Sequence, residues 1–287
     1  NLSLDIGKNI TAIAGRNATL KTTLLGMLGQ PFTISSGHPM YGCTTIDGYN
    51  FKSQFKEKFK ISKDFDHHGE HVWTLKFYKK GYYNDDEIKM ISIRRPTKSN
   101  PNDIRFWNAK SKAKGTGYVQ LPVYYLSLGR LFPIGETGKT KNIDINLTEE
   151  ENTYFVKIYK ELLSIQESKD AVAAMEIADA RRNFVGVNDN THDVFTNSAG
   201  ESNIGKIILA ILSFKRLKDE YGNKYKGGIL LIDELDATLY GYSQKKLVDF
   251  LYKTSQQFNI QIICTTHSPM VLQEVNNFQR KEIRKLQ

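Results

Sequence analysis

A lysine and a threonine at positions 21 and 22 follow a glycine-containing turn, and together they could bind a nucleotide phosphate. The segment reads AGRNATLKTTLLG over residues 14–26, with an apolar stretch before it and leucines at helical spacing after it. In a phosphate-binding loop, successive backbone N–H groups and a helix N-terminus point at the anion. Lys21 would lie near the outer phosphates, Thr22 would offer its hydroxyl to Mg²⁺, and Gly15 would make the turn after the strand.

One residue of this loop departs from the usual pattern. Leu20 stands where a glycine is expected before the lysine, at a place where the backbone must approach the phosphate closely. We expect its side chain to turn outward, toward the neighbouring apolar strand end, and the N–H groups of residues 18–22 to face the β-phosphate. The candidate nucleotide-binding residues of the loop are Gly15, Arg16, Asn17, Ala18, Thr19, Leu20, Lys21, Thr22 and Thr23.

Two adjacent acidic residues end the apolar stretch GGILLID, which predicts a buried strand. A strand places successive side chains on opposite faces, but at its carboxyl end both can reach one crevice. Asp233 would hold Mg²⁺, often through water, and Glu234 would orient or deprotonate the attacking water. The alternative is that the pair caps the helix that follows.

Two further segment ends carry polar residues. His267 lies at the tip of the predicted strand IQIICTTH, where it can contact a terminal phosphate, although a lone histidine can also be structural. Ser198, Gly200 and Glu201 precede a predicted long helix, where a hydroxyl and a flexible backbone can form an anion site. The alternative for this segment is a simple Ser or Asn helix cap.

The order of the elements predicts an α/β fold. Continuous apolar strands alternate with helices in the last third, which indicates a parallel sheet covered on both faces. Residues 51–126 are rich in short β-branched and aromatic stretches, GYVQLPVYYLSL included, and predict an inserted antiparallel region. Thr148 and Glu151 have capping-box spacing and predict a helix start. The segment DAVAAMEIADARRNF, residues 170–184, predicts a second helix or its continuation.

Composition and charge limit the class of protein. The 287 residues are 40% hydrophobic and 25% charged, as in ordinary soluble globular proteins, and no apolar run approaches the roughly 20 residues of a membrane span. Two distant cysteines fit no metal spacing and indicate a reducing compartment, so we expect a cytoplasmic location without membrane contact. The chain starts without Met and runs almost directly into an apolar stretch, so we expect a fragment of a longer chain.

The positive charge is unevenly distributed. The net charge is +9, and residues 51–114 hold 16 Lys and Arg against 8 Asp and Glu. A basic lobe of this kind can contact DNA or RNA. The alternative is a solvated set of hairpin edges, where lysine discourages strand pairing.

The segments described above, in this order, resemble the ATP-binding-cassette (ABC) type of ATPase, and more closely its soluble SMC, RecF and OLD-like branch. GRNATLKT resembles the Walker A loop, NSAGES the signature motif, LLIDE the Walker B strand, LDATL the D-loop and TTHSP the switch-histidine segment. The resemblance implies a P-loop NTPase fold with a mainly parallel sheet flanked by helices, and the cofactors ATP and Mg²⁺. It implies catalytic roles for Glu234 and His267, metal contacts by Thr22 and Asp233, and nucleotide contacts by Ser198, Gly200, Glu201 and Asp236.

The resemblance covers most of the chain and implies one ABC-type domain. Its parts are a P-loop unit over residues 1–30, an inserted β-rich lobe over 31–145, a helical arm and signature over 146–203, and a Walker B and switch-histidine half over 204–287. In this family two subunits sandwich two ATP molecules, so the resemblance implies a homodimer or higher oligomer. Ser198 and Gly200 of one copy would touch the γ-phosphate held by Lys21 of the other.

The branch includes many proteins of DNA repair and anti-phage defence. The phosphate-loop and signature segments of this sequence most resemble those of the anti-phage group of Septu-like and retron-associated ATPases. In that group the ATPase acts as a sensor or a scaffold, and a nuclease or toxin partner attacks the target. The sequence itself shows no nuclease motif. We therefore predict a slowly hydrolysing ATPase that controls such an effector. One alternative is a non-hydrolysing, nucleotide-gated scaffold, which Leu20 favours and the Asp233–Glu234 pair opposes. The other is a DNA-repair ATPase, for which residues 146–186 are short.

Overall fold

A four-stranded parallel sheet forms the centre of the molecule. The structure is a computed structural model that describes residues 2–52, 54–62, 64–78, 86–97, 103–110, 117–131, 140–165, 171–177, 182–188, 194 and 196–286. The strands are β1 (Ile10–Ala14), β5 (Val123–Leu126), β9 (Gly228–Ile232) and β10 (Ile260–Thr266). Their order is β1-β10-β9-β5, and every neighbouring pair is parallel.

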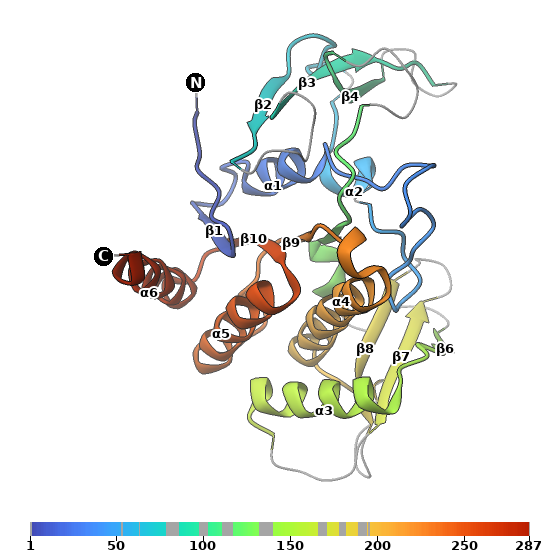
Figure 1. The fold of residues 1–287 in the computed structure, drawn as a ribbon, viewed down its shortest axis with the longest axis vertical. Helices are drawn as coiled ribbons and strands as arrows, with labels where there is room; N and C mark the ends of the chain where they lie inside the picture. Colours follow the sequence, from blue (N-terminus) through green and yellow to red (C-terminus); the bar gives the residue numbers. More distant parts are fainter. Residues whose placement is uncertain are drawn as a thin grey trace.

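Helices cover both faces of this sheet, as the alternation of strands and helices predicts. Leu230 and Ile232 of β9 point into one core, and Ile229 and Leu231 point into the other. The first core is closed by α4 (Ala199–Tyr221), α5 (Gly241–Phe258) and α6 (Pro269–Leu286). The second is closed by α1 (Lys21–Gly29), which lies between the sheet and the small sheet at the top of Figure 1. The α/β fold is confirmed.

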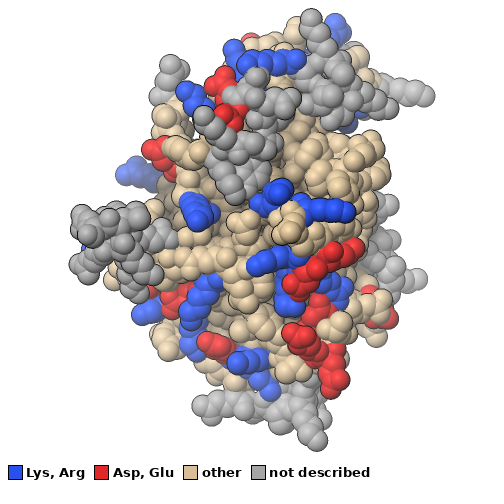
Figure 2. All heavy atoms as spheres, in the orientation of Figure 1, with Lys and Arg blue, Asp and Glu red and all other residues tan. Residues whose placement is uncertain are grey.

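An antiparallel sheet forms the inserted lobe. It consists of β2 (Val72–Lys76), β3 (Glu87–Arg94) and β4 (Ile104–Asn108), and the short α2 (Phe55–Lys58) lies beside it. Ile88, Met90, Ile104 and Phe106 pack into the same core as α1. In Figure 2 the described Lys and Arg of this upper lobe lie beside Asp and Glu on the face shown.

The prediction was wrong for β5, which the sequence pattern placed in the antiparallel region. β5 pairs in parallel with β9, and all four of its residues are buried. Such continuous burial is typical of a strand covered on both sides, whereas an antiparallel strand with one solvent face alternates. The 3₁₀ turn η1 (Leu128–Leu131) follows β5 directly.

The segment before α4 combines a helix with a third small sheet. α3 (Glu149–Leu163) begins at Thr148, where both hydrogen bonds of the predicted capping box are present. The helix predicted over residues 170–184 is wrong, because β7 (Ala171–Ile177) and β8 (Arg182–Asn188) form a hairpin there, extended by β6 (Thr140–Ile143). Accordingly, the expected helical arm is one helix plus this sheet.

Packing explains why the alanine-rich segment is a strand pair. α4 approaches β8 so closely that a Cβ on Gly205 would lie 2.1 Å from the carbonyl oxygen of Val185. Phe184, Val185 and Val187 are buried at this contact. Burial against a neighbouring element overrides the helix propensity of alanine.

α4 ends at Tyr221 with Gly222 as its C-cap residue, and the 3₁₀ turn η3 (Gly222–Lys224) lies between α4 and β9. Among the described residues, no helix has the length and apolar character that crossing a membrane requires.

Candidate functional site

The carboxyl ends of three parallel strands bring the candidate segments together. The register pairs Ala14 of β1 with Thr266 of β10, and Cys264 of β10 with Ile232 of β9. The loop after β1, the acids after β9 and the residues after β10 therefore leave the sheet at the same edge. Residues 14–20 are exposed, so the loop is open to solvent.

Thr22 and Asp233 meet at the centre of this edge, although 211 residues separate them in sequence. The hydroxyl of Thr22 donates to both carboxylate oxygens of Asp233, at 3.1 and 2.9 Å. Thr265 of β10 donates to the same carboxylate at 2.6 Å, and Asp233 is almost completely buried. A hydroxyl and a carboxylate at the rim of an open loop are oxygen ligands of the kind Mg²⁺ prefers, so these residues fit that ion.

The loop before α1 folds back on its own backbone. Lys21 Nζ donates to the carbonyl oxygen of Arg16 at 2.9 Å, and the Thr19 hydroxyl donates to the same oxygen at 2.7 Å. Ala18 and Leu20 both have a left-handed φ of 61°, a conformation that favours glycine. Leu20 is 71% exposed as a residue, so its side chain turns outward as expected, into solvent rather than onto an apolar strand end.

The backbone after β9 takes a strained path. Glu234 has a φ of 48°, and its N–H donates to the Thr265 hydroxyl at 2.7 Å. Thr238 also lies in the left-handed region, at 65°. The acid pair does not cap the following helix, because α5 begins after Tyr240. Strained residues persist where the surroundings hold them, and they gather at functional sites.

Asp236 joins this segment to the end of β10. Its Oδ1 accepts hydrogen bonds from the Thr266 hydroxyl and, at 3.2 Å, from the backbone N–H of His267. The backbone of His267 is therefore held beside the acidic segment, while the residue is exposed. The nucleotide contact predicted for Asp236 and the catalytic role predicted for His267 stay predictions.

Ser198 and Glu201 form a capping box at the start of α4. The Glu201 N–H donates to Ser198 Oγ at 3.3 Å, and the Ser198 N–H donates to Glu201 Oε2 at 2.7 Å. Gly200 and Glu201 lie within the first turn rather than before the helix. A Cβ on Gly200 would lie 2.7 Å from the Thr238 carbonyl oxygen, so glycine lets α4 approach the segment after β9. The helix-cap interpretation is confirmed, and the anion contact stays a prediction.

Arg130 is a residue of this region that the motif comparison missed. It lies in η1, directly after β5, and is buried. Burial lowers the pKa of its guanidinium to about 10, while Asp233, Glu234 and Asp236 act in the opposite direction. The sequence did contain a signal for Arg130. An arginine shortly after a buried parallel strand lies at the same edge of the sheet as the acids that follow β9.

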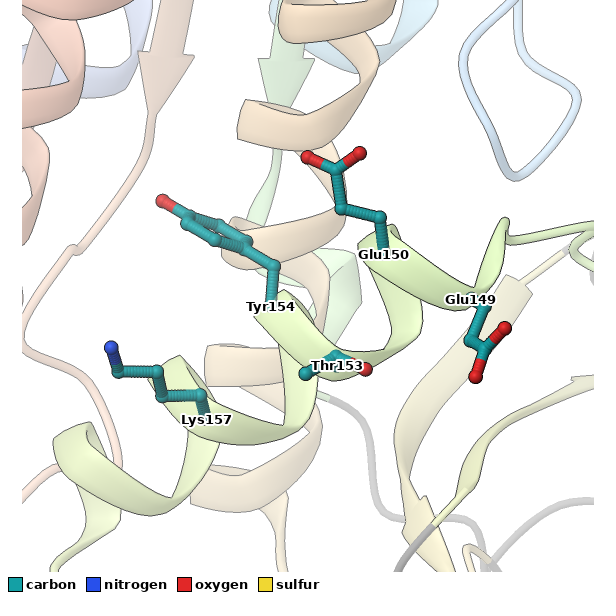
Figure 3. Close-up of a pocket in the computed structure, with 5 residues that line it drawn as sticks. All are labelled: Glu149, Glu150, Thr153, Tyr154 and Lys157. Carbon is teal, nitrogen blue, oxygen red and sulfur yellow. The ribbon is translucent and has the colours of Figure 1, made fainter.

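A shallow pocket elsewhere does not belong to this site. It is lined by Glu149, Glu150, Thr153, Tyr154 and Lys157, all on α3 (Figure 3). α3 lies at the bottom of Figure 1, whereas α1 and the loop before it lie above the central sheet. Among the described residues, no group of three His, Cys, Asp or Glu side chains is arranged to hold a metal ion.

Comparison with solved structures identifies the fold. A crystal structure titled as the SmcHead bound to the C-winged helix domain of ScpA superposes with a TM-score of 0.51 and 15% identity, over 94% of this chain and 85% of that one. The SMC head domain from Thermotoga maritima is also similar, with a TM-score of 0.44 and 14% identity over the same shares. The first of these two matches shows that the chain has the fold of an SMC-type head.

A family model matches part of the chain. Residues 136–272 match the family described as "AAA ATPase domain", and this stretch includes the signature, acidic and histidine segments. No curated protein matches the chain. The family match supports ATPase activity, as the sequence predicts.

Proposed function

We propose that this protein binds ATP at the edge formed by β1, β9 and β10, hydrolyses it slowly, and uses the cycle to control an effector. The contact between Thr22 and Asp233 carries the proposal, since it joins the phosphate loop to the acidic strand end at 2.9 Å. These two side chains would hold Mg²⁺, which would neutralise phosphate charge. Lys21 would contact the outer phosphates, and the remaining loop residues would cradle them through backbone N–H groups.

Glu234 and His267 are proposed as the catalytic pair. Glu234 would orient or deprotonate the attacking water, and His267 would contact the terminal phosphate. Both leave the sheet at the edge that carries Thr22, which supports the assignment. Slow turnover is expected because alignment of water and γ-phosphate is more demanding than binding, and the loop carries two residues, Ala18 and Leu20, in a conformation that favours glycine.

The proposed working unit is a homodimer or a higher oligomer closed by ATP. Ser198, Gly200 and Glu201 of one copy would meet the phosphate held by the other copy. The N-terminus of α4 lies beside Thr238, and both Ser198 and Thr238 are exposed, which supports this arrangement because a second copy could reach the signature segment. ATP would favour the closed form, and hydrolysis would release it.

The proposed setting is anti-phage defence, with a nuclease or toxin as the effector partner. The similarity of the loop and signature segments to Septu-like and retron-associated ATPases supports it, and the SMC head with ScpA shows that a related fold binds a partner protein. The basic excess of residues 51–114 supports a contact with DNA or RNA. In cells that carry the gene for this protein together with its neighbouring genes, Lys21→Ala should abolish protection against phage. Unchanged protection contradicts the proposed setting.

ATP binding is tested by Lys21→Ala. Backbone amides alone cannot offset the phosphate charge, so the variant should lose measurable ATP affinity in calorimetry. Lys157→Ala on α3 is the matched control and should bind as the unmodified protein does. Equal affinity in Lys21→Ala and the control contradicts the assignment of the loop.

Assembly is tested by Glu234→Gln. This substitution removes the base while both phosphate sites remain, so ATP should accumulate a closed dimer. Light scattering should report a larger mass with ATP than without it, and Glu150→Gln should not accumulate this species. A mass that ATP never changes in either protein contradicts the sandwich.

The second candidate is a nucleotide-gated scaffold without hydrolysis, favoured by the left-handed φ of 61° at Ala18 and Leu20. The scaffold would be favoured if the unmodified protein binds ATP but hydrolyses it no faster than Glu234→Gln does. An SMC- or RecF-like repair ATPase is equally consistent with the fold. ATP hydrolysis that duplex DNA stimulates, together with no protection of cells against phage, would favour the repair ATPase.

A further inference from the structure

Arg130 makes a set of hydrogen bonds that reach three different elements around the proposed site. Its Nη1 donates to the carbonyl oxygens of Leu126 and Ser127, at 3.2 and 2.9 Å, at the end of β5. Its Nη2 donates to the carbonyl oxygen of Glu234 at 2.9 Å. Its Nε donates to Oδ1 of Asn203 in α4 at 2.7 Å.

Asn203 extends these hydrogen bonds to Ala237, three residues after Glu234. It is completely buried, and its Nδ2 donates to the carbonyl oxygen of Ala237 at 3.0 Å. Arg130 and Asn203, hereafter the Arg130–Asn203 pair, therefore bond the backbone at both ends of residues 234–237. Glu234, which begins this stretch, and Thr238, which follows it directly, both have a left-handed φ.

We propose that Arg130 is a positioning residue for ATP hydrolysis, which acts with Asn203 to hold the Glu234 backbone in its left-handed conformation and in a fixed place relative to α4. The inference rests on the proposed function. A buried arginine beside three acids could also serve as a counter-charge, but its hydrogen bonds go to backbone carbonyls and to Asn203 rather than to a carboxylate. The observed geometry is that of a backbone clamp.

In the proposed dimer the clamp links two ATP sites, because the start of α4 would meet the phosphate held by the other copy, whereas Glu234 would serve the ATP bound to its own chain. Asn203 lies two residues after Glu201 of the capping box, so the pair joins the start of α4 to the backbone of Glu234, whose carboxylate would activate water. A change in the position of α4 on closure would therefore reach Glu234 through two hydrogen-bonded side chains. Nucleotide affinity depends on the loop before α1, which the pair does not touch in the bonds above.

The chemistry requires an arginine. The guanidinium is a planar fork with donors pointing in several fixed directions, whereas a lysine ammonium is a point charge on a flexible stem. Arg130→Lys keeps the charge but cannot reach the Glu234 carbonyl, Asn203 and the β5 end together. Arg130→Met removes both the charge and the donors at similar length. If charge alone mattered, the lysine variant would behave as the unmodified protein does.

The experiment measures kcat and ATP affinity for Arg130→Met, Arg130→Lys and Asn203→Leu. We expect each to lower kcat at least tenfold while ATP affinity stays within threefold, which is about 0.65 kcal/mol or less. The double variant Arg130→Met/Asn203→Leu should be no slower than the slower single variant, because residues that act as one unit are not additive. The control is Arg216→Met, which removes a bidentate arginine from the same helix, α4, about 20 Å along its axis from Asn203.

Arg216 binds Glu151 at 2.6 and 2.5 Å, outside the proposed site. The control should lower stability with kcat and affinity unchanged. A parallel loss of kcat and affinity in the Arg130 variants, or an Arg130→Lys variant with full kcat, overturns the positioning role.

A second measurement needs no nucleotide. Amide hydrogen exchange in Arg130→Met should speed up within residues 198–206 and 233–239 and stay unchanged in β2, β3 and β4. Unchanged or globally faster exchange overturns the inference. If the unmodified protein hydrolyses ATP no faster than Lys21→Ala, the proposed function fails, and the exchange pattern alone then decides whether the clamp exists.

Discussion

Replacing Leu20 with glycine should relieve backbone strain in the phosphate loop. Leu20 has φ 61° and ψ 22°, in the left-handed region, where an L-residue costs about 1–2 kcal/mol. Glycine avoids this cost but gives the unfolded chain more freedom, which offsets about 0.4–1 kcal/mol. Because Leu20 is 71% exposed, removal of its side chain loses little buried apolar surface.

Leu20→Ala is the matched reference, since it removes the same apolar side chain but keeps the Cβ that causes the strain. We expect Leu20→Gly to exceed Leu20→Ala in the free energy of unfolding by about 0.5–1 kcal/mol, measured in urea. In a regular helix the order is the reverse, with glycine about 1 kcal/mol worse than alanine. A glycine variant less stable than the alanine variant by that amount would refute the left-handed assignment.

The same variants test the proposed function. The strained residue is turned away from the loop interior, so Leu20→Gly should leave ATP affinity within roughly tenfold, about 1.4 kcal/mol, and any gain should appear in turnover. Calorimetry and steady-state hydrolysis on the three proteins supply both numbers. An affinity gain near a thousandfold would show that the natural loop is damaged, and the scaffold alternative would replace the ATPase proposal.

Two further predictions concern stability. Gly205→Ala should destabilise the protein by at least about 1–3 kcal/mol, because the added Cβ would lie 2.1 Å from the Val185 carbonyl oxygen, and an unchanged urea midpoint contradicts the close packing of α4 on β8. Burial by itself raises the pKa of Glu151, but hydrogen bonds from Arg216 and Thr148 outweigh it, and the net pKa is lowered. Glu151 therefore contributes stability that is fully present above its unfolded pKa of about 4.3 and is lost as pH falls through the lower folded pKa. The deficit of Arg216→Met in unfolding free energy at pH 7 should shrink in that acid range, and a deficit that stays constant down to pH 3 contradicts the ion-pair account.

The elements of the proposed site could be predicted because their signals are local. The apolar strands that became β1, β9 and β10 end in polar residues, and parallel strands bring such ends to one edge. The start of α3 follows from Thr148 and Glu151, which satisfy each other's backbone N–H within one turn. A prediction holds wherever the stabilising partner lies within a few residues in the chain.

The failures occur where the partner is distant. The segment over residues 170–184 has the alanine content of a helix, yet β7 and β8 form a hairpin because β8 packs against α4. β5 looks like the antiparallel strands before it, but its partner is β9, more than 100 residues later. Local propensity differs by less than about 1 kcal/mol per residue, and burial of a whole face exceeds it.

By itself, the sequence determined the α/β class, the order of the motifs and the presence of polar groups at three strand ends, since these depend on residue type and periodicity. Only the tertiary structure shows that the Thr22 hydroxyl donates a hydrogen bond to Asp233 and that Leu20 is exposed to solvent. It also shows that Arg130 and Asn203 donate hydrogen bonds to the backbone of residues 234–237. Each of these contacts joins residues far apart in the chain, or depends on how one helix sits against another. Such contacts are set by the packing of the whole core, which no local pattern encodes.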